Sequence, residues 1–226
     1  MWSEIIILTK SYKNGGYCVA GLDTFTMKLV RIISEDTDTD NSISISQMTY
    51  ISGEEIQIYD LVLINIVNFS PNTHFHQPEN ILCDSKSIWA FVRKSSLAEV
   101  THMILPQNYN NIFYNSDRKV SQELIDGLPI SEYYSLMLIP AEDACLEVFF
   151  NQFKEKLDVK LNLKYNGIIY NGISVTGREI KDKAIQMFNS NQNSIINISK
   201  SRFLFLSIAG CPYEGYYYKF LASILR

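Results

Sequence analysis

The sequence predicts a mainly β fold with minor α content, arranged as two small β-barrels. Residues 5–8 form an apolar, β-branched run that is typical of a buried strand. The motif N-G-G at 14–16 is a tight-turn signal, since glycine adopts positive φ freely and asparagine tolerates it. Gly21 lies inside the next strand, at 17–22. It indicates a sharp bend or a close backbone approach that curls a sheet into a barrel.

The bulk composition is that of an ordinary globular chain. With 226 residues, of which 46% are hydrophobic and 19% charged, there is enough chain for one or two domains with real cores. We see no secretory signal and no apolar run near the roughly 20 residues of a membrane helix, so we expect a cytoplasmic protein without membrane contact. The cysteines lie more than sixty residues apart, which favours reduced thiols; they are Cys18, Cys83, Cys145 and Cys211.

Charge is distributed unevenly along the chain. The net charge of −4 by itself argues against a generic nucleic-acid binder. However, residues 35–60 hold seven acids and no Lys or Arg, whereas residues 151–226 carry a net +6. The asymmetry indicates a partner for the basic third of the chain, although ordinary solvated faces explain it equally well.

The chain divides into two β-rich halves, which we place at 1–130 and 131–226. In the first half, the acidic segment 35–60 has too few apolar residues to pack by itself, so we expect a long exposed loop there. In the second half, strands alternate with N-G turn signals, and a helix is expected at 177–189. Each half therefore has the strand and turn spacing of a five-stranded barrel.

The motif T-G-R-E at 176–179 has the spacing of a capping box and opens the best helix in the chain. Apolar residues at 180, 184, 187 and 188 form an amphipathic stripe along this helix. Its first turns carry Arg178 and Lys181 beside unpaired N–H groups, which makes a physically reasonable anion site. The alternative is an ordinary capped helix with no ligand.

Metal and catalytic signals are weak. His74, His76 and Cys83 have side chains that ligate zinc, but no fourth ligand lies at a convincing spacing, so we expect a metal-free protein. No nucleophile–base pair, paired carboxylate or P-loop is visible. We therefore lean against an enzyme and expect no cofactor.

Several stretches of the sequence resemble the dual OB-fold domain family. The opening S-Y-K-N-G-G-Y-C-V-A-G-L-D, followed by L-V-R-I-I-S, is similar to the start of that family. So are H-F-H-Q-P-E-N, the Tyr-Asn-Gly before V-T-G, and the closing Y-K-F-L-A-S-I-L. The resemblance spans nearly the whole chain. It implies two tandem OB-like barrels with short helices, and an association with nucleic-acid modification or bacterial defence against phages.

Two functions follow as hypotheses. The leading one is a non-enzymatic binder of nucleic acid or a nucleotide, using basic residues on the backbone and aromatic residues on the bases. Its candidate residues are Lys10, Lys13, Tyr17, Lys28 and Arg31 in the first barrel, and Thr176, Arg178, Lys181, Lys200, Arg202 and Lys219 in the second. The alternative is an adaptor subunit of a multi-protein defence complex that contacts other defence proteins and no nucleic acid.

Overall fold

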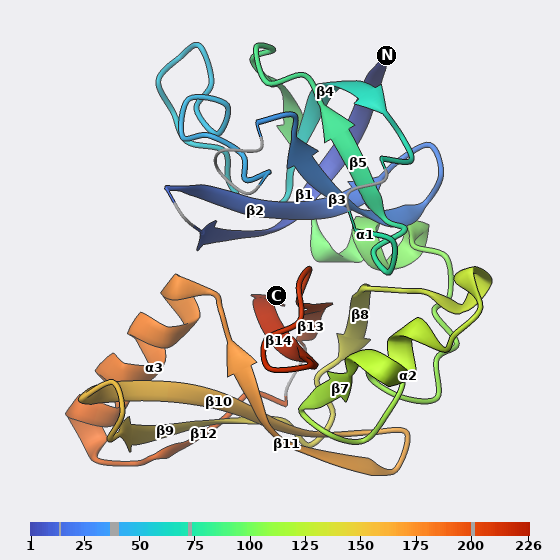
Figure 1. Ribbon diagram of the computed structural model, residues 1–226. Helices are drawn as coiled ribbons and strands as arrows, with labels where there is room; N and C mark the ends of the chain where they lie inside the picture. Colours follow the sequence, from blue (N-terminus) through green and yellow to red (C-terminus); the bar gives the residue numbers. More distant parts are fainter. Residues whose placement is uncertain (14, 37–40, 72–73, 200–201) are drawn as a thin grey trace. The chain divides into compact units, whose positions relative to one another are not determined.

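The computed structural model describes residues 1–13, 15–36, 41–71, 74–199 and 202–226, and shows the expected mainly β fold. The chain forms two compact units, Met1–Pro106 and Gln107–Arg226 (Figure 1). The boundary thus lies earlier than the one at 130/131 drawn from the sequence. Residues 107–130 go with the C-terminal unit because β7 (Lys119–Ser121) pairs with its last strand and Ile112 and Phe113 enter its core.

The N-terminal unit is a closed five-stranded barrel, as the sequence predicts. Its strands pair in the order β1-β2-β3-β5-β4, and β4 closes the barrel by pairing with β1. The β3–β5 pair is parallel and the others are antiparallel. A sixth strand, β6, adds to β4 at the edge. The strands are β1 (Trp2–Lys13), β2 (Gly16–Asp23), β3 (Lys28–Ser34), β4 (Asp60–Asn68), β5 (Asn80–Cys83) and β6 (Ala90–Lys94).

Gly21 is a point of close backbone approach, which confirms the prediction from the sequence. A Cβ atom at this position would lie 2.3 Å from the Ile6 carbonyl oxygen and 2.7 Å from Cγ2 of Ile5. Both neighbours belong to β1, which pairs with β2 in antiparallel register and has a register shift just after Ile7, the residue opposite Gly21. Glycine therefore lets the first two strands come together tightly enough to curl the sheet.

The segment between β3 and β4, light blue in Figure 1, is a loop but is not wholly exposed. In its described part, Ile43, Met48 and Ile56 are each fully buried and pack into the barrel core. The prediction of an exposed loop was wrong for these residues. Three apolar side chains spread along an acidic segment are enough to anchor that segment when they can pack into a neighbouring hydrophobic core. Asp38 and Asp40 lie outside the described residues.

Two short helices have local caps at their ends. In α1 (Leu97–Met103), the Ser96 hydroxyl accepts a hydrogen bond from the Glu99 N–H. Helix α2 (Gln122–Asp126) ends at Gly127. Among the helices in the described parts of the chain, none is long and apolar enough to cross a membrane.

The C-terminal unit repeats the strand order of the first. Its sheet runs β12-β9-β10-β11-β14-β13-β8, with a parallel β11–β14 pair. Only residues 141–144 separate β8 from β9, so these two strands together correspond to the first strand of the barrel. The sheet order therefore begins next to β9 and ends at β8, the other part of that same strand. The remaining elements are β8 (Leu136–Pro140), β9 (Cys145–Asn151), β10 (Lys156–Tyr165), β11 (Ile168–Val175), α3 (Arg178–Asn191), β12 (Ile195–Asn197), β13 (Phe203–Ile208) and β14 (Tyr216–Leu225).

Helix α3 begins without the predicted capping box. Gly177 is the N-cap, and no side chain caps the helix. The Thr176 hydroxyl donates to the Leu221 carbonyl oxygen instead, at 3.2 Å, and so joins β11 to β14. Gly177 is required here because a Cβ would lie 2.6 Å from the Ala222 carbonyl oxygen. From this start, α3 packs against β9, β10 and β11 (Figure 1).

Candidate nucleic-acid interface

In the N-terminal barrel, two of the predicted cations have structural partners. The Lys10 ammonium donates to the Glu55 carboxylate and to the Ile56 carbonyl oxygen, each at 2.8 Å, and its side chain is only 10% exposed. Arg31 donates to the Asn80 side-chain oxygen at 2.9 Å, and burial lowers the pKa of its guanidinium. The structure therefore uses both residues to tie strands and loop together.

The outer face of β2 and β3 is mostly apolar, with Arg31 and Cys18 half-buried among its side chains. Ala20, Leu22, Leu29 and Ile33 alternate with the core residues of these strands, and all four are buried. Lys28 is exposed at the start of β3, while Tyr17 is half-buried against Tyr12, with ring centroids 6.0 Å apart. The side chain of Lys13 lies outside the described residues. Among the side chains that the structure describes, the predicted residues of this barrel are thus not gathered into one open cationic surface.

The suspected zinc ligands do not converge on a site. The Cys83 thiol is fully buried, and its sulfur accepts a hydrogen bond from the Gln47 amide at 3.7 Å. Burial raises the pKa of this thiol to about 12. His74 and His76 lie with ring centroids 6.3 Å apart. No group of three metal-ligating side chains occurs in the portion of the chain described here.

Among the predicted residues of the C-terminal barrel, Lys219 is removed from the candidate surface. It is 1% exposed, and its ammonium donates to the carbonyl oxygens of Ile112 and Asn115 and to the Asn115 side chain. Burial lowers the pKa of this amine to about 7, against an opposing contribution from Asp117. Lys219 therefore fastens the 112–115 segment to β14. No surface ligand can reach it.

The remaining predicted residues of this barrel differ in exposure. Arg178 is 82% exposed at the start of α3, with Asp182 3.7 Å away. Lys181 is paired with the Asp158 carboxylate at 3.0 Å. Arg202 is half-buried at the edge of β13, and burial and the nearby Arg226 lower its pKa. Lys200 lies outside the described residues.

The structure gathers a different set of cations on the outer face of β10. Side chains of this strand alternate, so that Val159, Leu161 and Leu163 enter the core while Lys160 and Lys164 face outward. The Lys160 ammonium donates to the Ser174 hydroxyl on β11 at 2.8 Å. We call the surface formed around these strands the basic face; its cations are Arg118, Lys154, Lys160, Lys164 and Lys181.

Electrostatic interactions link four of these cations, namely Arg118, Lys154, Lys160 and Lys181. Burial lowers the pKa of Lys160; Asp158 raises it, and the charges of Arg118, Lys154 and Lys181 lower it further. Asp158 is 6% exposed and accepts from Lys154 and Lys181, each at 3.0 Å. One carboxylate thus holds two amines in place. Glu147, which lies opposite Lys160 on β9 and accepts from the Asn162 amide, adds a second carboxylate, so five cations stand against these two acids.

Asp158 is the fixed centre of this arrangement, so its replacement has a predictable cost. Burial alone would raise its pKa, but the bonds from Lys181 and Lys154 outweigh burial and hold the pKa below its usual range. We expect Asp158→Asn to lower the free energy of unfolding by about 2 kcal/mol at pH 7.

Asp158 adds to the free energy of unfolding at pH values above about 4, the ordinary pKa of an aspartate. Below that pH this stabilisation is lost, because the carboxyl of the unfolded chain takes up a proton at a higher pH than the carboxyl of the folded chain. Hydrogen exchange of β9 and β10 at pH 7 and pH 3 measures this. The deficit of the variant should shrink at pH 3. An equal deficit at both pH values would contradict the role assigned to this carboxylate.

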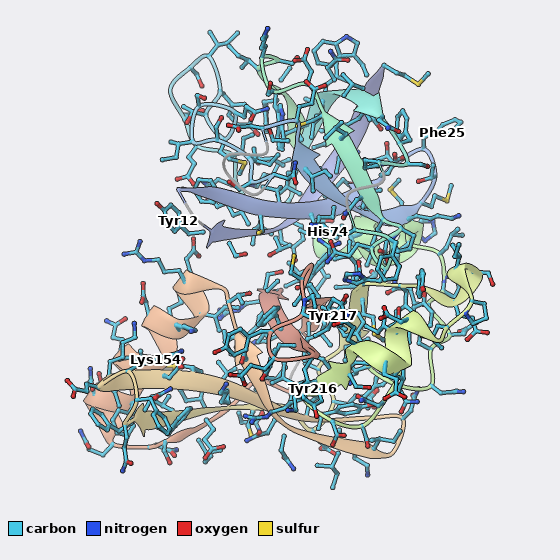
Figure 2. The ribbon with its side chains drawn as sticks, in the orientation of Figure 1. Tyr12, Phe25, His74, Lys154, Tyr216 and Tyr217 are labelled. Atoms are coloured by element: carbon cyan, nitrogen blue, oxygen red, sulfur yellow. The ribbon has the colours of Figure 1, made fainter. Side chains whose placement is uncertain are left out.

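The hairpin between β9 and β10 adds an aromatic side chain beside the basic face. Phe153 stands at its tip with its side chain fully exposed, next to Lys154. Figure 2 labels Lys154 at this end of the sheet, beside α3. An exposed phenylalanine flanked by lysine is suited to stacking on a base whose phosphate the lysine contacts.

The sequence contained a signal for part of this face. Lys160 and Lys164 alternate with leucines along one strand, which already separates a cationic face from an apolar one. What the sequence could not show is that Arg118, far away in the chain, comes to the same face beside Gly172. Phe153 gave no periodic signal, because it lies in a turn.

Comparison with known proteins agrees with the topology. The family model of the dual OB-containing domain matches residues 3–224, nearly the whole chain. No curated protein and no solved structure matches the chain. OB barrels bind oligonucleotides and oligosaccharides on the face of their second and third strands and on adjoining loops. In the C-terminal unit those strands are β10 and β11, which carry the basic face. By fold and by sequence, the chain belongs to the family of dual OB-containing domains.

Proposed function

We propose that this chain is a non-enzymatic nucleic-acid-binding module that holds a single strand on the basic face of its C-terminal barrel. The observation that carries the proposal is the position of the five cations on and around β10, beside β11, where OB barrels hold their ligands. On the outer face of β2 and β3, Arg31 is held by Asn80 among buried apolar side chains, so the described side chains of the N-terminal barrel offer no comparable cluster of cations.

A single strand fits this surface better than a duplex. The exposed Phe153 ring offers a stacking platform, and only unpaired bases can leave a stack to use it. Lys160 and Lys164 lie on the same side of one strand, four residues apart. Since a strand rises about 3.3 Å per residue, their separation of about 13 Å spans two phosphates of an extended chain.

Fluorescence anisotropy with a labelled oligothymidylate at several salt concentrations tests the proposal. We expect wild type to bind at low salt, and Lys160→Gln with Lys164→Gln to lower the slope of log affinity against log salt by about 1.4, or about 0.7 per lost phosphate contact. Phe153→Ala should weaken binding about tenfold with little change in slope. Lys28→Gln, an exposed lysine of the other barrel, is the matched control and should change neither.

Two results would overturn the proposal. One is the absence of binding to single-stranded DNA or RNA at low salt. The other is a loss from Lys28→Gln as large as that from the paired substitution in β10, since this would mean diffuse attraction without a site.

We place this binding module in the bacterial cytoplasm, within a nucleic-acid-modification or anti-phage system in which it supplies the binding step.

A second candidate function is that of an adaptor that contacts other proteins of such a system. It is favoured by the exposed pocket of the N-terminal barrel. Purification from the native host, with identification of copurifying protein and nucleic acid, separates the two.

A further inference from the structure

The N-terminal unit carries a surface cavity of about 550 Å³ that the proposed function does not use. It lies between the edge strand β6 and the segment that leads into β4. Both elements belong to the same unit, and the cavity lies away from β2 and β3 in the pairing order. Its lining residues are Tyr50, Ser52, Glu54, Glu55, Gln57, Asp60, Phe91 and Lys94.

Two aromatic rings form part of the cavity wall. Tyr50 and Phe91 meet edge to face, with centroids 5.6 Å apart and planes at 69°. Phe91 is 52% exposed, so much of its ring is open to a ligand. The Tyr50 hydroxyl donates to the Asp60 carboxylate at 2.8 Å, which fixes the orientation of its ring. The wall is therefore preformed.

The polar lining is mainly acidic. Asp60 is buried and fully engaged, since it accepts from Tyr50, from the Gln57 N–H and from the Lys94 ammonium, the last two at 2.7 Å. Glu54 is different: it is exposed, and within the described residues it makes no ion pair. Its carboxylate accepts only a long bond of 3.4 Å from the Ser52 hydroxyl. A carboxylate thus stands at the cavity with most of its bonding capacity unused.

We propose that this pocket binds an arginine side chain presented by an extended basic segment of a partner protein. A guanidinium stacks on an exposed aromatic ring and forks onto a carboxylate, and Phe91 with Glu54 supplies both groups. The acidic lining repels phosphate. The pocket therefore favours a cationic ligand, whereas the basic face favours an anionic one. The inference does not depend on nucleic-acid binding.

Features around the pocket point to a protein partner. Ile51, which lies between the lining residues Tyr50 and Ser52, is 90% exposed. Apolar side chains around a charged anchor site are typical of protein interfaces, where arginine and aromatic residues carry much of the binding energy. The acid-rich segment 35–60, which contains Glu54, adds charge complementarity to a basic segment.

An NMR titration of the full chain with capped pentapeptides tests the pocket. The probe is acetyl-Gly-Gly-Arg-Gly-Gly-amide, and its neutral match has citrulline in place of arginine. We expect the arginine peptide to shift the amide signals of Tyr50, Glu54 and Phe91, and the citrulline peptide to bind about tenfold more weakly. Glu54→Gln and Phe91→Ala should each weaken binding about fivefold. Glu142→Gln, an exposed acid of the other unit, is the control and should have no effect.

Different results would contradict the arginine pocket and the protein partner. Shifts that miss the pocket, equal binding of the citrulline peptide, or an equal loss from Glu142→Gln would each overturn the proposal. If arginine amide alone binds as tightly as the pentapeptide, the site is one for a small cation, and the protein partner is wrong. Glu54 and Phe91 are exposed, so neither substitution should impair folding.

Discussion

Replacing Gly21 with alanine is expected to lower the free energy of unfolding of the N-terminal barrel by about 3 kcal/mol. The added methyl group would lie 2.3 Å from a backbone oxygen of β1, and backbone cannot rotate away as a flexible side chain can. The β1–β2 contact must open instead, in a barrel whose strands also close onto β4. Tryptophan fluorescence during urea denaturation measures this, because Trp2 and Trp89 both lie in this unit.

Gly53→Ala is the matched control for this substitution. Gly53 has a φ of +86°, and nothing lies near an added Cβ. Alanine there meets only backbone strain of about 1 kcal/mol. If Gly21→Ala destabilises the barrel no more than Gly53→Ala, close approach is not the reason for glycine at position 21.

The second large effect concerns the buried amine of the C-terminal barrel. Lys219→Met should lower the free energy of unfolding by about 3 kcal/mol at pH 7, because it leaves the oxygens of Ile112 and Asn115 buried without their donor. Hydrogen exchange of β14 and of residues 112–115 locates the loss. Lys183→Met, at an exposed position on α3, is the control and should have little effect.

The same amine predicts a pH dependence. Its pKa is lowered to about 7 in the folded protein, so above pH 7 the unfolded chain binds a proton that the folded chain does not. Stability should therefore rise between pH 7 and 9, by at most about 1.4 kcal/mol per pH unit from this group. The Lys219→Met variant should lack this rise. A rise of the same size in the variant would contradict the assignment.

Sequence patterns predicted the fold where the constraint is local. The turn before Gly16 and the close approach at Gly21 both depend on the two strands of one hairpin. Both are present in the structure, apart from Asn14, which lies outside the described residues. The pairing of distant strands came from the family resemblance. No local pattern dictates that β3 pairs with β5 in parallel.

The candidate site was harder to predict because exposure depends on tertiary contacts. Lysine is usually a surface residue, but Lys219 lies two positions from both Tyr217 and Leu221 on β14. It therefore points to the same, buried side of the strand as they do. Thr176 has the spacing of a cap, but its hydroxyl finds a carbonyl on β14 that is distant in sequence. For each of these residues, the partner that determines its role comes from a strand that the sequence does not place.

Photo-crosslinking tests the central claim most directly. A single-stranded oligonucleotide with bromodeoxyuridine in place of thymidine is bound to the full chain at low salt and irradiated, and the modified peptides are identified by mass spectrometry. The account predicts crosslinks at Phe153 and along β10 and β11, which are lost on addition of unlabelled strand. Crosslinks confined to residues 1–106, or a modified protein without any crosslink on the basic face, would contradict it.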